Sequence, residues 1–272
     1  MLEVKDLRVV YPNGNEAIKS ISLRANRGEI IAVVGRSGAG KSTILRCING
    51  LQPSTSGQVI LDNEDITAMS QAQLRQARRH IGFIWQEYNL VERLPAITNV
   101  LTGRLGYDSG FGSLFGYFSR REREIALNSL ERVHMLHRAS FRADRLSGGE
   151  KQRVSIARAI AQEPKIILAD EPVASLDPEL SEQVMHDLAR VAREVGVLTL
   201  INIHHVELAK KFCDRIIGIA QGVVVYDGVP EGLSSEVLHR IYRFDKPPVH
   251  VEAAPADLAW QSGLANELAT GI

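Results

Sequence analysis

The sequence predicts an α/β protein with a mostly parallel central sheet. Strand-like apolar runs alternate with amphipathic helical segments along much of the chain, a pattern typical of parallel strands joined by crossover helices. A glycine-rich phosphate-binding loop at residues 35–42 stands between one such strand and a helix. The 272 residues, 44% of them hydrophobic, are enough for one or two compact domains with a real core.

The first part of the chain is expected to form a small antiparallel sheet and then the phosphate-binding unit. A turn with hairpin chemistry at residues 11–15 separates the first two strands. Helices are expected from Ser42 to Gly50 and from a Ser70 cap to Arg79. Alternating or continuous apolar runs predict strands at residues 2–10, 18–23, 29–34, 59–61 and 81–85.

Residues 87–163 differ from the preceding part of the chain in their hydrophobic pattern, which predicts a helical insert. They contain no convincing strand, and helices are expected at residues 121–136 and 148–162. Residues 103–118 within the insert are rich in glycine and aromatic side chains. We therefore predict one α/β domain over residues 2–245, with the helical segment inserted into it.

After the insert, strands and helices alternate again. Helices are expected at residues 179–194 and 206–213, the first with apolar side chains at helical spacing. The strands of this part are expected at residues 165–169, 198–203, 215–220 and 223–226. This alternation completes the prediction of a mostly parallel core.

Residues 246–272 form a tail beyond the expected domain. Pro247 and Pro248 break the chain, and Trp260, Leu264 and Leu268 then recur at helical spacing. A short helix packed on a neighbouring surface and a loosely ordered tail are equal alternatives. The sequence assigns this tail no function.

Composition and charge bear on three functional questions: nucleic-acid binding, the redox state of the cysteines and insertion into a membrane. Lys plus Arg and Asp plus Glu both number 32, so the formal net charge is zero and gives no reason to expect a nucleic-acid partner. Cys47 and Cys213 lie far apart in apolar settings, which predicts buried free thiols in a reducing compartment. The start of the chain lacks a signal-peptide pattern, and no apolar run approaches the ~20 residues that span a bilayer. Work at a membrane would require docking on a partner.

The stretch from Gly35 to Ser42 reads G-x-x-x-x-G-K-S and has the most specific chemistry in the chain. Its glycines permit a tight turn that brings several backbone N–H groups close to a polyphosphate, and the next helix points its positive end there. A chance glycine turn is the alternative, which the flanking strand and helix disfavour. The expected nucleotide-binding residues are Gly35, Ser37, Gly38, Gly40, Lys41, Ser42 and Thr43.

Two acidic residues after a later strand are the expected second half of this site. Lys41 is expected to reach the β- and γ-phosphates, Ser42 to bind Mg²⁺, and Thr43 to hydrogen-bond the α-phosphate. An apolar strand that ends in Asp170 and Glu171 places two carboxylates at the ligand-binding edge of a sheet. Asp170 would hold Mg²⁺ directly or through water, and Glu171 would polarise the attacking water. A solvated acidic turn is the alternative, less favoured beside the upstream loop.

A Ser-Gly-Gly turn at residues 147–149 opens a second helix suited to anion binding. One site does not need two such helix ends on a single subunit. A head-to-tail dimer does, because each subunit can then close this turn on the γ-phosphate bound to the other. The alternative is an ordinary helix N-cap, which leaves the glycine pair and the basic continuation unexplained. The residues expected to contact nucleotide in this way are Ser147, Gly149 and Glu150.

From residue 2 to about residue 243, the sequence resembles the ATP-binding cassette (ABC) transporter ATPases. Glu150 stands where many members have Gln, and Glu also occurs there. The resemblance implies a P-loop NTPase with a RecA-like parallel-sheet core, an N-terminal antiparallel β subdomain and an inserted α-helical subdomain. It rests on the loop Gly35–Ser42, Gln86 after a strand, the signature Leu146–Glu150, Asp170-Glu171, Ser175-Leu176-Asp177 and His204.

The same resemblance implies roles for residues outside the phosphate-binding loop. Tyr11 would stack on the adenine, and Asp177 would lie at the dimer interface. Gln86 would sense Mg²⁺ and water and couple the site to a membrane partner. His204 would contact the γ-phosphate; its neighbour His205 is the alternative, and the family pattern alone selects His204.

Within the family, several longer runs look like the phosphonate-importer ATPases, the PhnC family. A single cassette with neither a coiled-coil insert nor fused membrane helices is similar to the ATPase subunit of a bacterial importer. Related systems import phosphate or phosphite, and residues of this subunit do not distinguish these substrates. The runs are residues 86–94, 98–107, 169–178, 203–209 and 214–218.

This resemblance implies ATP and Mg²⁺ as cofactors, with ATP hydrolysis coupled to uptake. The implied partners are a second copy of the chain, two transmembrane permease subunits and an extracytoplasmic substrate-binding protein. The implied location is peripheral, on the cytoplasmic face of the inner membrane. Contact with the permease is expected near Gln86 and the aromatic run 107–118; the alternative, equally weighted, is that these aromatics fill the insert's own core.

Two other functions use parts of the same pattern. A soluble ABC ATPase could act as a regulator or repair clamp without a permease, although the single cassette without a coiled coil argues against it. A small-molecule kinase could use the phosphate-binding loop, but the signature Leu146–Glu150 would have no task in such an enzyme.

Overall fold

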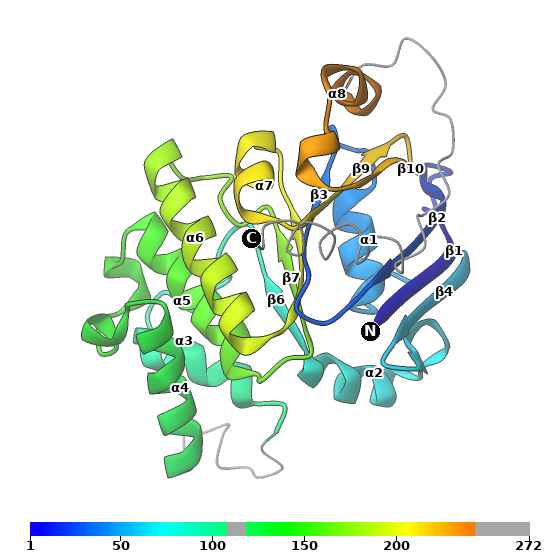
Figure 1. The fold of residues 1–272 in the computed structure, drawn as a ribbon. Coiled ribbons are helices and arrows are strands. Elements are labelled where there is room, and N and C mark those ends of the chain that lie inside the picture. Colours follow the sequence, from blue (N-terminus) through cyan, green and yellow to red (C-terminus); the bar gives the residue numbers. More distant parts are fainter. Residues whose placement is uncertain (108–117, 243–272) are drawn as a thin grey trace, which may run out of the picture.

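A single sheet organises the protein, whose computed structural model describes residues 1–107 and 118–242 (Figure 1). Ten strands within these described residues make up the sheet: β1 (Leu2–Val10), β2 (Glu16–Ala25), β3 (Ile30–Val34), β4 (Ser56–Leu61), β5 (Glu64–Asp65), β6 (Ile81–Ile84), β7 (Ile166–Asp170), β8 (Leu198–Asn202), β9 (Arg215–Ala220) and β10 (Val223–Gly228). Their order across the sheet is β5-β4-β1-β2-β10-β9-β3-β8-β7-β6.

The half of the sheet that carries the phosphate-binding loop is parallel. β3 lies between β9 and β8, β7 pairs with β8, and β6 forms the edge. The register sets Asn202 beside both Val33 and Asp170, so the carboxyl ends of β3, β8 and β7 meet at one place. This edge is where open α/β sheets bind ligands. The prediction of a mostly parallel core is confirmed.

The other half of the sheet is antiparallel and begins with the first strand. β1 pairs antiparallel with β2 and β4, and β4 pairs in the same way with the short β5. β2 joins the core where Ser20 lies beside Val223 of β10. The expected small N-terminal antiparallel sheet is therefore confirmed, and it is continuous with the parallel core.

The helices cover both faces of the parallel strands. They are α1 (Lys41–Ile48), α2 (Gln71–Ala77), α3 (Ala96–Leu101), α4 (Arg120–Arg132), α5 (Gly148–Ala161), α6 (Pro178–Val195), α7 (Val206–Phe212) and α8 (Ser235–Tyr242). The helices α3, α4 and α5 pack on one another, at the side of the molecule away from β1, β2 and β4 (Figure 1).

Two hydrophobic clusters, one on each face of the sheet, explain why the core strands are apolar throughout. Along β3, Ile30, Ala32 and Val34 belong to one cluster, while Ile31 and Val33 belong to the other. Alternate side chains of a strand point to opposite faces, so a strand covered on both sides reads as a continuous apolar run. Helix α1 packs in the second cluster, and α5, α6 and α7 pack in the first.

Two helices were not expected from the sequence. Helix α3 has only six residues after Pro95, which is too short to display a helical period. Helix α8 has eight residues and buries only Val237 and Ile241. Their positions depend on packing against the rest of the fold more than on a local pattern.

Helix boundaries differ from the expected ones where the backbone changes conformation. The helix expected to end at Leu136 ends at Arg132, because His134 adopts a φ of 58°, which a helix cannot continue through. The expected Ser70 cap is present as a capping box with Gln73, and α2 ends at Ala77 before a short 3₁₀ turn.

Two expected features lie wholly or partly outside the described residues. The whole tail at residues 246–272 does so, as do residues 108–117 of the aromatic stretch. Tyr107, which is described, donates its hydroxyl to the carbonyl oxygens of Arg79 and Gln162 at 3.0 and 2.7 Å. The guanidinium of Arg104 lies 4.1 Å from its ring centroid. Tyr107 therefore packs within its own subunit.

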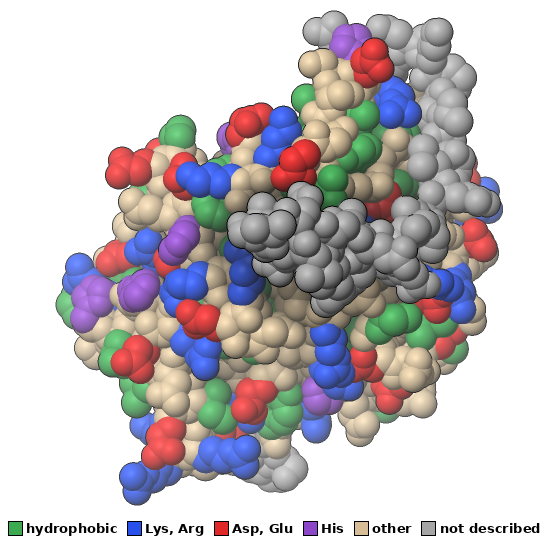
Figure 2. All heavy atoms as spheres, in the orientation of Figure 1, with side chains coloured by type: hydrophobic (Ala, Val, Ile, Leu, Met, Phe, Trp, Pro, Cys, Tyr) green, Lys and Arg blue, Asp and Glu red, His purple; other side chains and the backbone are tan. Residues whose placement is uncertain are grey.

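The described surface carries charges of both signs. On the face shown in Figure 2, basic and acidic side chains are interspersed. Among residues 1–107 and 118–242, no helix has the combined length and apolar character that crossing a bilayer requires.

The two cysteines are expected to resist alkylation in the folded protein. Cys47 and Cys213 are unpaired and buried, and burial raises the pKa of each thiol to about 12. Iodoacetamide reacts with the thiolate, so we expect no labelling of native protein at pH 8 and labelling of both thiols in denaturant. Mass spectrometry measures both states, and rapid native labelling would contradict the buried positions.

An ion pair between β9 and β10 is expected to stabilise the fold. Arg215 binds Asp227 through two nitrogens at 2.5 and 2.6 Å, and the aspartate side chain is 2% exposed. Because Asp227→Asn removes the closer counter-charge of a partly buried guanidinium and leaves only Glu29 at 3.7 Å, it should lower the free energy of unfolding by roughly 2 kcal/mol. Urea denaturation measures the loss. Glu124→Gln, in the exposed pair with Arg120, is the control and should change stability by less than about 0.5 kcal/mol.

Candidate functional site

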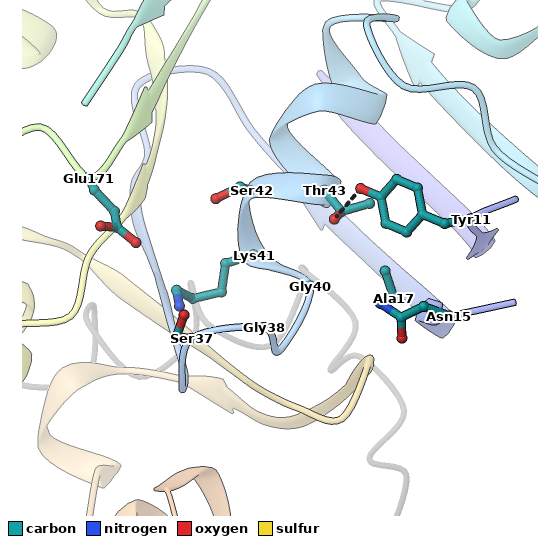
Figure 3. A pocket seen from close by; sticks show the side chains of 10 residues that line it. All are labelled: Tyr11, Asn15, Ala17, Ser37, Gly38, Gly40, Lys41, Ser42, Thr43 and Glu171. Carbon is teal, nitrogen blue, oxygen red and sulfur yellow. Dashed lines mark hydrogen bonds between the residues drawn. The ribbon is translucent and has the colours of Figure 1, made fainter. Parts of the chain in front are cut away.

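A cavity of about 220 Å³ lies at the carboxyl edge of the parallel strands (Figure 3). The loop after β3 and the first turn of α1 form one side, and Glu171 after β7 reaches in from another. The turn between β1 and β2 supplies the remaining side. The lining residues are Tyr11, Asn15, Ala17, Ser37, Gly38, Gly40, Lys41, Ser42, Thr43 and Glu171.

Glycine is required in the loop for a steric reason. Gly40, immediately before α1, has a φ of 105°, and a Cβ at this position would lie 2.5 Å from the carbonyl oxygen of Ala17. Only glycine adopts this conformation readily, and only glycine lets the two backbones approach so closely. The loop is thereby held against β2, with the start of α1 directed at the cavity (Figure 3).

Lys41 supplies the positive charge of the cavity. Its ammonium group donates to the carbonyl oxygens of Gly35 and Arg36 at 2.8 and 2.9 Å, so the side chain folds back along the loop. Burial lowers the pKa of Lys41, while the nearby carboxylates of Glu171 and Asp170 act to raise it. A desolvated cation at the start of a helix is suited to a phosphate.

Ser42, Asp170 and Asn202 form a hydrogen-bonded group beside the loop. The Ser42 hydroxyl donates to Asp170 Oδ1 at 2.8 Å. The Asn202 amide donates to Asp170 Oδ1 at 2.6 Å and to Ser42 Oγ at 3.1 Å. Asp170 is 6% exposed and Asn202 is fully buried, with its Oδ1 lacking a hydrogen-bond partner.

This group fits a hard divalent cation such as Mg²⁺. A hydroxyl and a carboxylate offer oxygen ligands, which Mg²⁺ prefers, and one or two protein ligands suffice when substrate phosphates complete the shell. No cluster of three or more His, Cys, Asp or Glu that could hold a metal occurs in the part of the chain that the structure describes.

Glu171 and His204 meet on the side of the cavity opposite the loop. Glu171 Oε1 lies 2.5 Å from His204 Nε2. Glu171 has a φ of 52°, and its backbone N–H donates to the carbonyl oxygen of Asn202 at 3.0 Å. A left-handed conformation costs a non-glycine residue of order 1 kcal/mol or more, and such strain tends to cluster at functional sites. The geometry suits a carboxylate that accepts a proton from water, and a histidine that orients this carboxylate by a hydrogen bond.

The neighbouring histidine occupies a different position. Glu171, His204 and His205 line a second cavity of about 130 Å³. His205 precedes α7 as its N-cap residue and makes no side-chain capping bond. The hydrogen bond to Glu171 therefore favours His204 over His205 for a role at the phosphate-binding loop.

Tyr11 and Thr43 lie together at the far end of the cavity. Their hydroxyl oxygens are 3.1 Å apart, as the dashed line in Figure 3 shows. The ring of Tyr11 borders the cavity beyond the loop, where a nucleobase would extend from bound phosphates. The structure thus brings Tyr11 to the same cavity as Lys41.

The signature residues lie outside this cavity in the single subunit. Ser147 is the N-cap of α5 and forms a capping box with Glu150. Burial acts to raise the pKa of Glu150. Hydrogen bonds from Ser147 and the charge of Arg138 outweigh this effect and hold the pKa below its usual range. A Cβ at Gly149 would lie 2.1 Å from Leu180 Cδ2, so a larger residue would require the Leu180 side chain to move.

Two other expected site residues also lie outside the cavity. Asp177 is exposed at the N-cap of α6, where its carboxylate accepts from the N–H of Leu180 at 3.0 Å. Gln86 is exposed in the segment that follows β6 and lines none of the cavities described above. Both lie where chain segments leave the same edge of the sheet as Asp170.

Three residues of the site were not expected from the sequence. Asn15 and Ala17 line the cavity only because the β1–β2 turn folds over the loop, which no local pattern shows. Asn202 had a detectable signal, because it is a polar residue near the end of an otherwise apolar strand. Its partners, however, are 160 and 32 residues away in the chain.

Comparisons with known proteins agree with this fold and site. Residues 18–174 match the ABC transporter family. The phosphonates import ATP-binding protein PhnC of Bacillus thuringiensis subsp. konkukian (strain 97-27) is 47% identical over 242 residues, which cover 89% of this chain and 94% of that protein. The protein of the same name from Lactococcus lactis subsp. lactis (strain IL1403) is 44% identical over 243 residues, covering 89% and 99%.

A solved structure is similar as well. It is the ATP-binding cassette MJ0796 in a dimeric, post-hydrolysis state bound to ADP and Pi, with 34% sequence identity and a TM-score of 0.74. The match covers 85% of this chain and 100% of that chain. The fold, the assembled phosphate-binding site and these relatives together show that the chain belongs to the ABC transporter family and, within it, to the phosphonates import ATP-binding proteins (PhnC).

Proposed function

We propose that this chain is the ATP-hydrolysing subunit of a bacterial importer and couples ATP binding and hydrolysis to the uptake of phosphonate. The observation that carries the proposal is the meeting of three strand ends behind the phosphate-binding loop. There, Ser42 and Asp170 can hold a cation while Glu171 faces the loop with His204 at 2.5 Å. Relatives at 44–47% identity are named for phosphonates import.

ATP binding uses the cavity along its length. Backbone N–H groups of the loop and the start of α1 receive the phosphates, and the Lys41 ammonium leaves the loop carbonyls to bind phosphate oxygens. The Thr43 hydroxyl reaches the α-phosphate, and Tyr11 offers its ring to the adenine. Ser42 and Asp170 would hold Mg²⁺, which would supply positive charge against the phosphates.

Hydrolysis needs a base, an oriented water and a stabilised phosphate. Glu171 accepts a proton from the attacking water. His204 holds the Glu171 carboxylate in position and contacts the γ-phosphate as a donor. Gln86, in the segment that follows β6, reports the state of this site to the membrane partner.

A second copy of the chain completes the site. Ser147, Gly149 and Glu150 lie outside the cavity of their own subunit, and their helix start would cap the γ-phosphate bound to a partner copy. Asp177 lies at the interface of this head-to-tail dimer. The MJ0796 cassette, which is similar in fold, is dimeric in its solved structure.

The remaining partners follow from the importer function. Two transmembrane permease subunits bind the dimer on the cytoplasmic face of the inner membrane, and an extracytoplasmic substrate-binding protein delivers the substrate. The helical segment α3–α5, together with Gln86, contacts the permease. Closure and reopening of the dimer then drive the permease between its two orientations.

Co-purification from membranes tests this function. The tagged chain should bring down membrane proteins, and its ATPase activity should rise when a candidate binding protein carries a phosphonate. Stimulation by phosphate or phosphite and not by phosphonate would reassign the substrate. A soluble dimer with ATPase activity and no membrane partner would overturn the importer function in favour of a regulator or repair clamp. Phosphate transfer to a small acceptor would instead indicate a kinase.

A further inference from the structure

Asn202 occupies a central position at the site. It is the last residue of β8, which lies between β3 and β7. The register places it beside Val33, just before the phosphate-binding loop, and beside Asp170. Its side chain is fully buried. Asn202 therefore borders both halves of the site across the sheet.

The amide group of Asn202 contacts both expected cation ligands. Nδ2 lies 2.6 Å from Asp170 Oδ1 and 3.1 Å from Ser42 Oγ. The orientation of the amide follows from chemistry, because an ionised carboxylate accepts hydrogen bonds and cannot donate them. The atom facing Asp170 must be the nitrogen, and Oδ1 is left buried without a partner.

These bonds leave Ser42 ready for a cation. A hydroxyl has one proton and two lone pairs. The proton points to Asp170 at 2.8 Å, and one lone pair accepts from Asn202. One lone pair on Ser42 Oγ therefore remains for a metal ion. Without the Asn202 amide, the hydroxyl and the carboxylate would lose the shared donor that holds them side by side.

Asn202 also supports the residue expected to activate water. Its backbone carbonyl oxygen accepts from the N–H of Glu171 at 3.0 Å, while Glu171 keeps a left-handed φ of 52°. The same strand end thus holds the cation ligands through its side chain and the Glu171 backbone through its main chain.

A purely structural role does not explain an amide at this position. The preceding residues Leu200 and Ile201 are apolar and fully buried. An apolar side chain at position 202 would avoid burying an unpaired carbonyl oxygen, which is unfavourable. The amide is useful here for its donor end, which faces the two expected ligands.

We propose that Asn202 is a positioning residue for the cation bound with ATP, and that it holds Ser42 Oγ and the Asp170 carboxylate in the arrangement that receives Mg²⁺. This inference rests on the proposed ATP-binding function. Groups that orient metal ligands typically contribute 10- to 100-fold to metal affinity. Asn202 should accordingly contribute to nucleotide binding only when Mg²⁺ is present.

The test measures ATP affinity with Mg²⁺ and with a chelator, using the full chain and a fluorescent ATP analogue. Asn202→Leu removes both hydrogen bonds at similar volume. In the wild type, Mg²⁺ is expected to raise the affinity for ATP. In Asn202→Leu, this Mg²⁺-dependent increase should be at least about tenfold smaller. Its affinity in chelator should stay within about twofold of wild type. Asn202→Ser, whose hydroxyl is too short to reach both partners, should behave alike and serves if the leucine variant does not fold.

Thr199→Val is the matched control. Thr199 is fully buried on the same strand, and its hydroxyl bonds only the carbonyl oxygen of Val197 among the described residues, at 3.4 Å. Its Mg²⁺-dependent gain in affinity should equal that of the wild type.

Two results would overturn the inference alone: an Asn202 variant that keeps the full Mg²⁺-dependent gain, or one that loses affinity equally with and without Mg²⁺. Both leave ATP binding by the wild type intact. A wild type that binds ATP in neither condition would overturn the proposed function, and this inference with it.

Discussion

Glu171→Gln is expected to slow ATP hydrolysis by roughly 10²- to 10⁴-fold, the range typical for loss of a general base. The amide has the shape of the carboxylate but cannot accept a proton from water. It can still hydrogen-bond His204, which lies 2.5 Å from the native carboxylate, so the fold and ATP binding should survive. Release of phosphate measured at saturating ATP and Mg²⁺ gives the rate.

Glu182→Gln is the matched control for this variant. Glu182 is an exposed acid on α6 that pairs with Lys211, away from the cavity. Its hydrolysis rate should stay within about twofold of wild type. If Glu171→Gln kept a rate near that of the wild type, another group would have to activate the water, and the role proposed for Glu171 would be wrong.

Lys41→Met should lower the affinity for ATP by roughly 100-fold. A hydrogen bond to a charged group contributes about 1.5–3 kcal/mol, and the ammonium is the basic group that lines the cavity. Methionine fills a similar volume without charge. It also leaves the carbonyl oxygens of Gly35 and Arg36 without their donor. Equilibrium titration with a fluorescent ATP analogue measures the loss.

Lys211→Met tests whether the effect depends on position. Lys211 is an exposed lysine in the pair with Glu182, so its removal changes the net charge equally. Its ATP affinity should equal that of the wild type. Equal losses in both variants would indicate a general charge effect and would contradict the contact proposed for Lys41.

The core of the fold could be predicted because its strands are marked by composition. β3 and β7 are covered on both faces and are apolar at nearly every position, so they stand out without knowledge of their neighbours. Helices α3 and α8 could not be predicted in the same way. They are short, and they form because the surrounding fold provides a surface to pack on.

In the candidate site, too, some residues could be predicted from the sequence and others could not. The loop from Gly35 to Ser42 is recognisable because its backbone chemistry is local: glycines, a lysine and a helix start in eight consecutive residues. Asp170 and Glu171 are recognisable because they end an apolar strand. Asn202 was missed although it is a polar residue near the end of an apolar strand, because its role depends on partners 160 and 32 residues away in the chain.

By itself, the sequence determined the motifs, the alternation of strands and helices, and the family to which they point. These depend on interactions between residues close in the chain, which leave a readable pattern. Only the tertiary structure decided that β8 lies between β3 and β7, and therefore that Asn202 joins Ser42 to Asp170. Strand order is set by packing between residues far apart in the chain, and that packing leaves no local pattern to read.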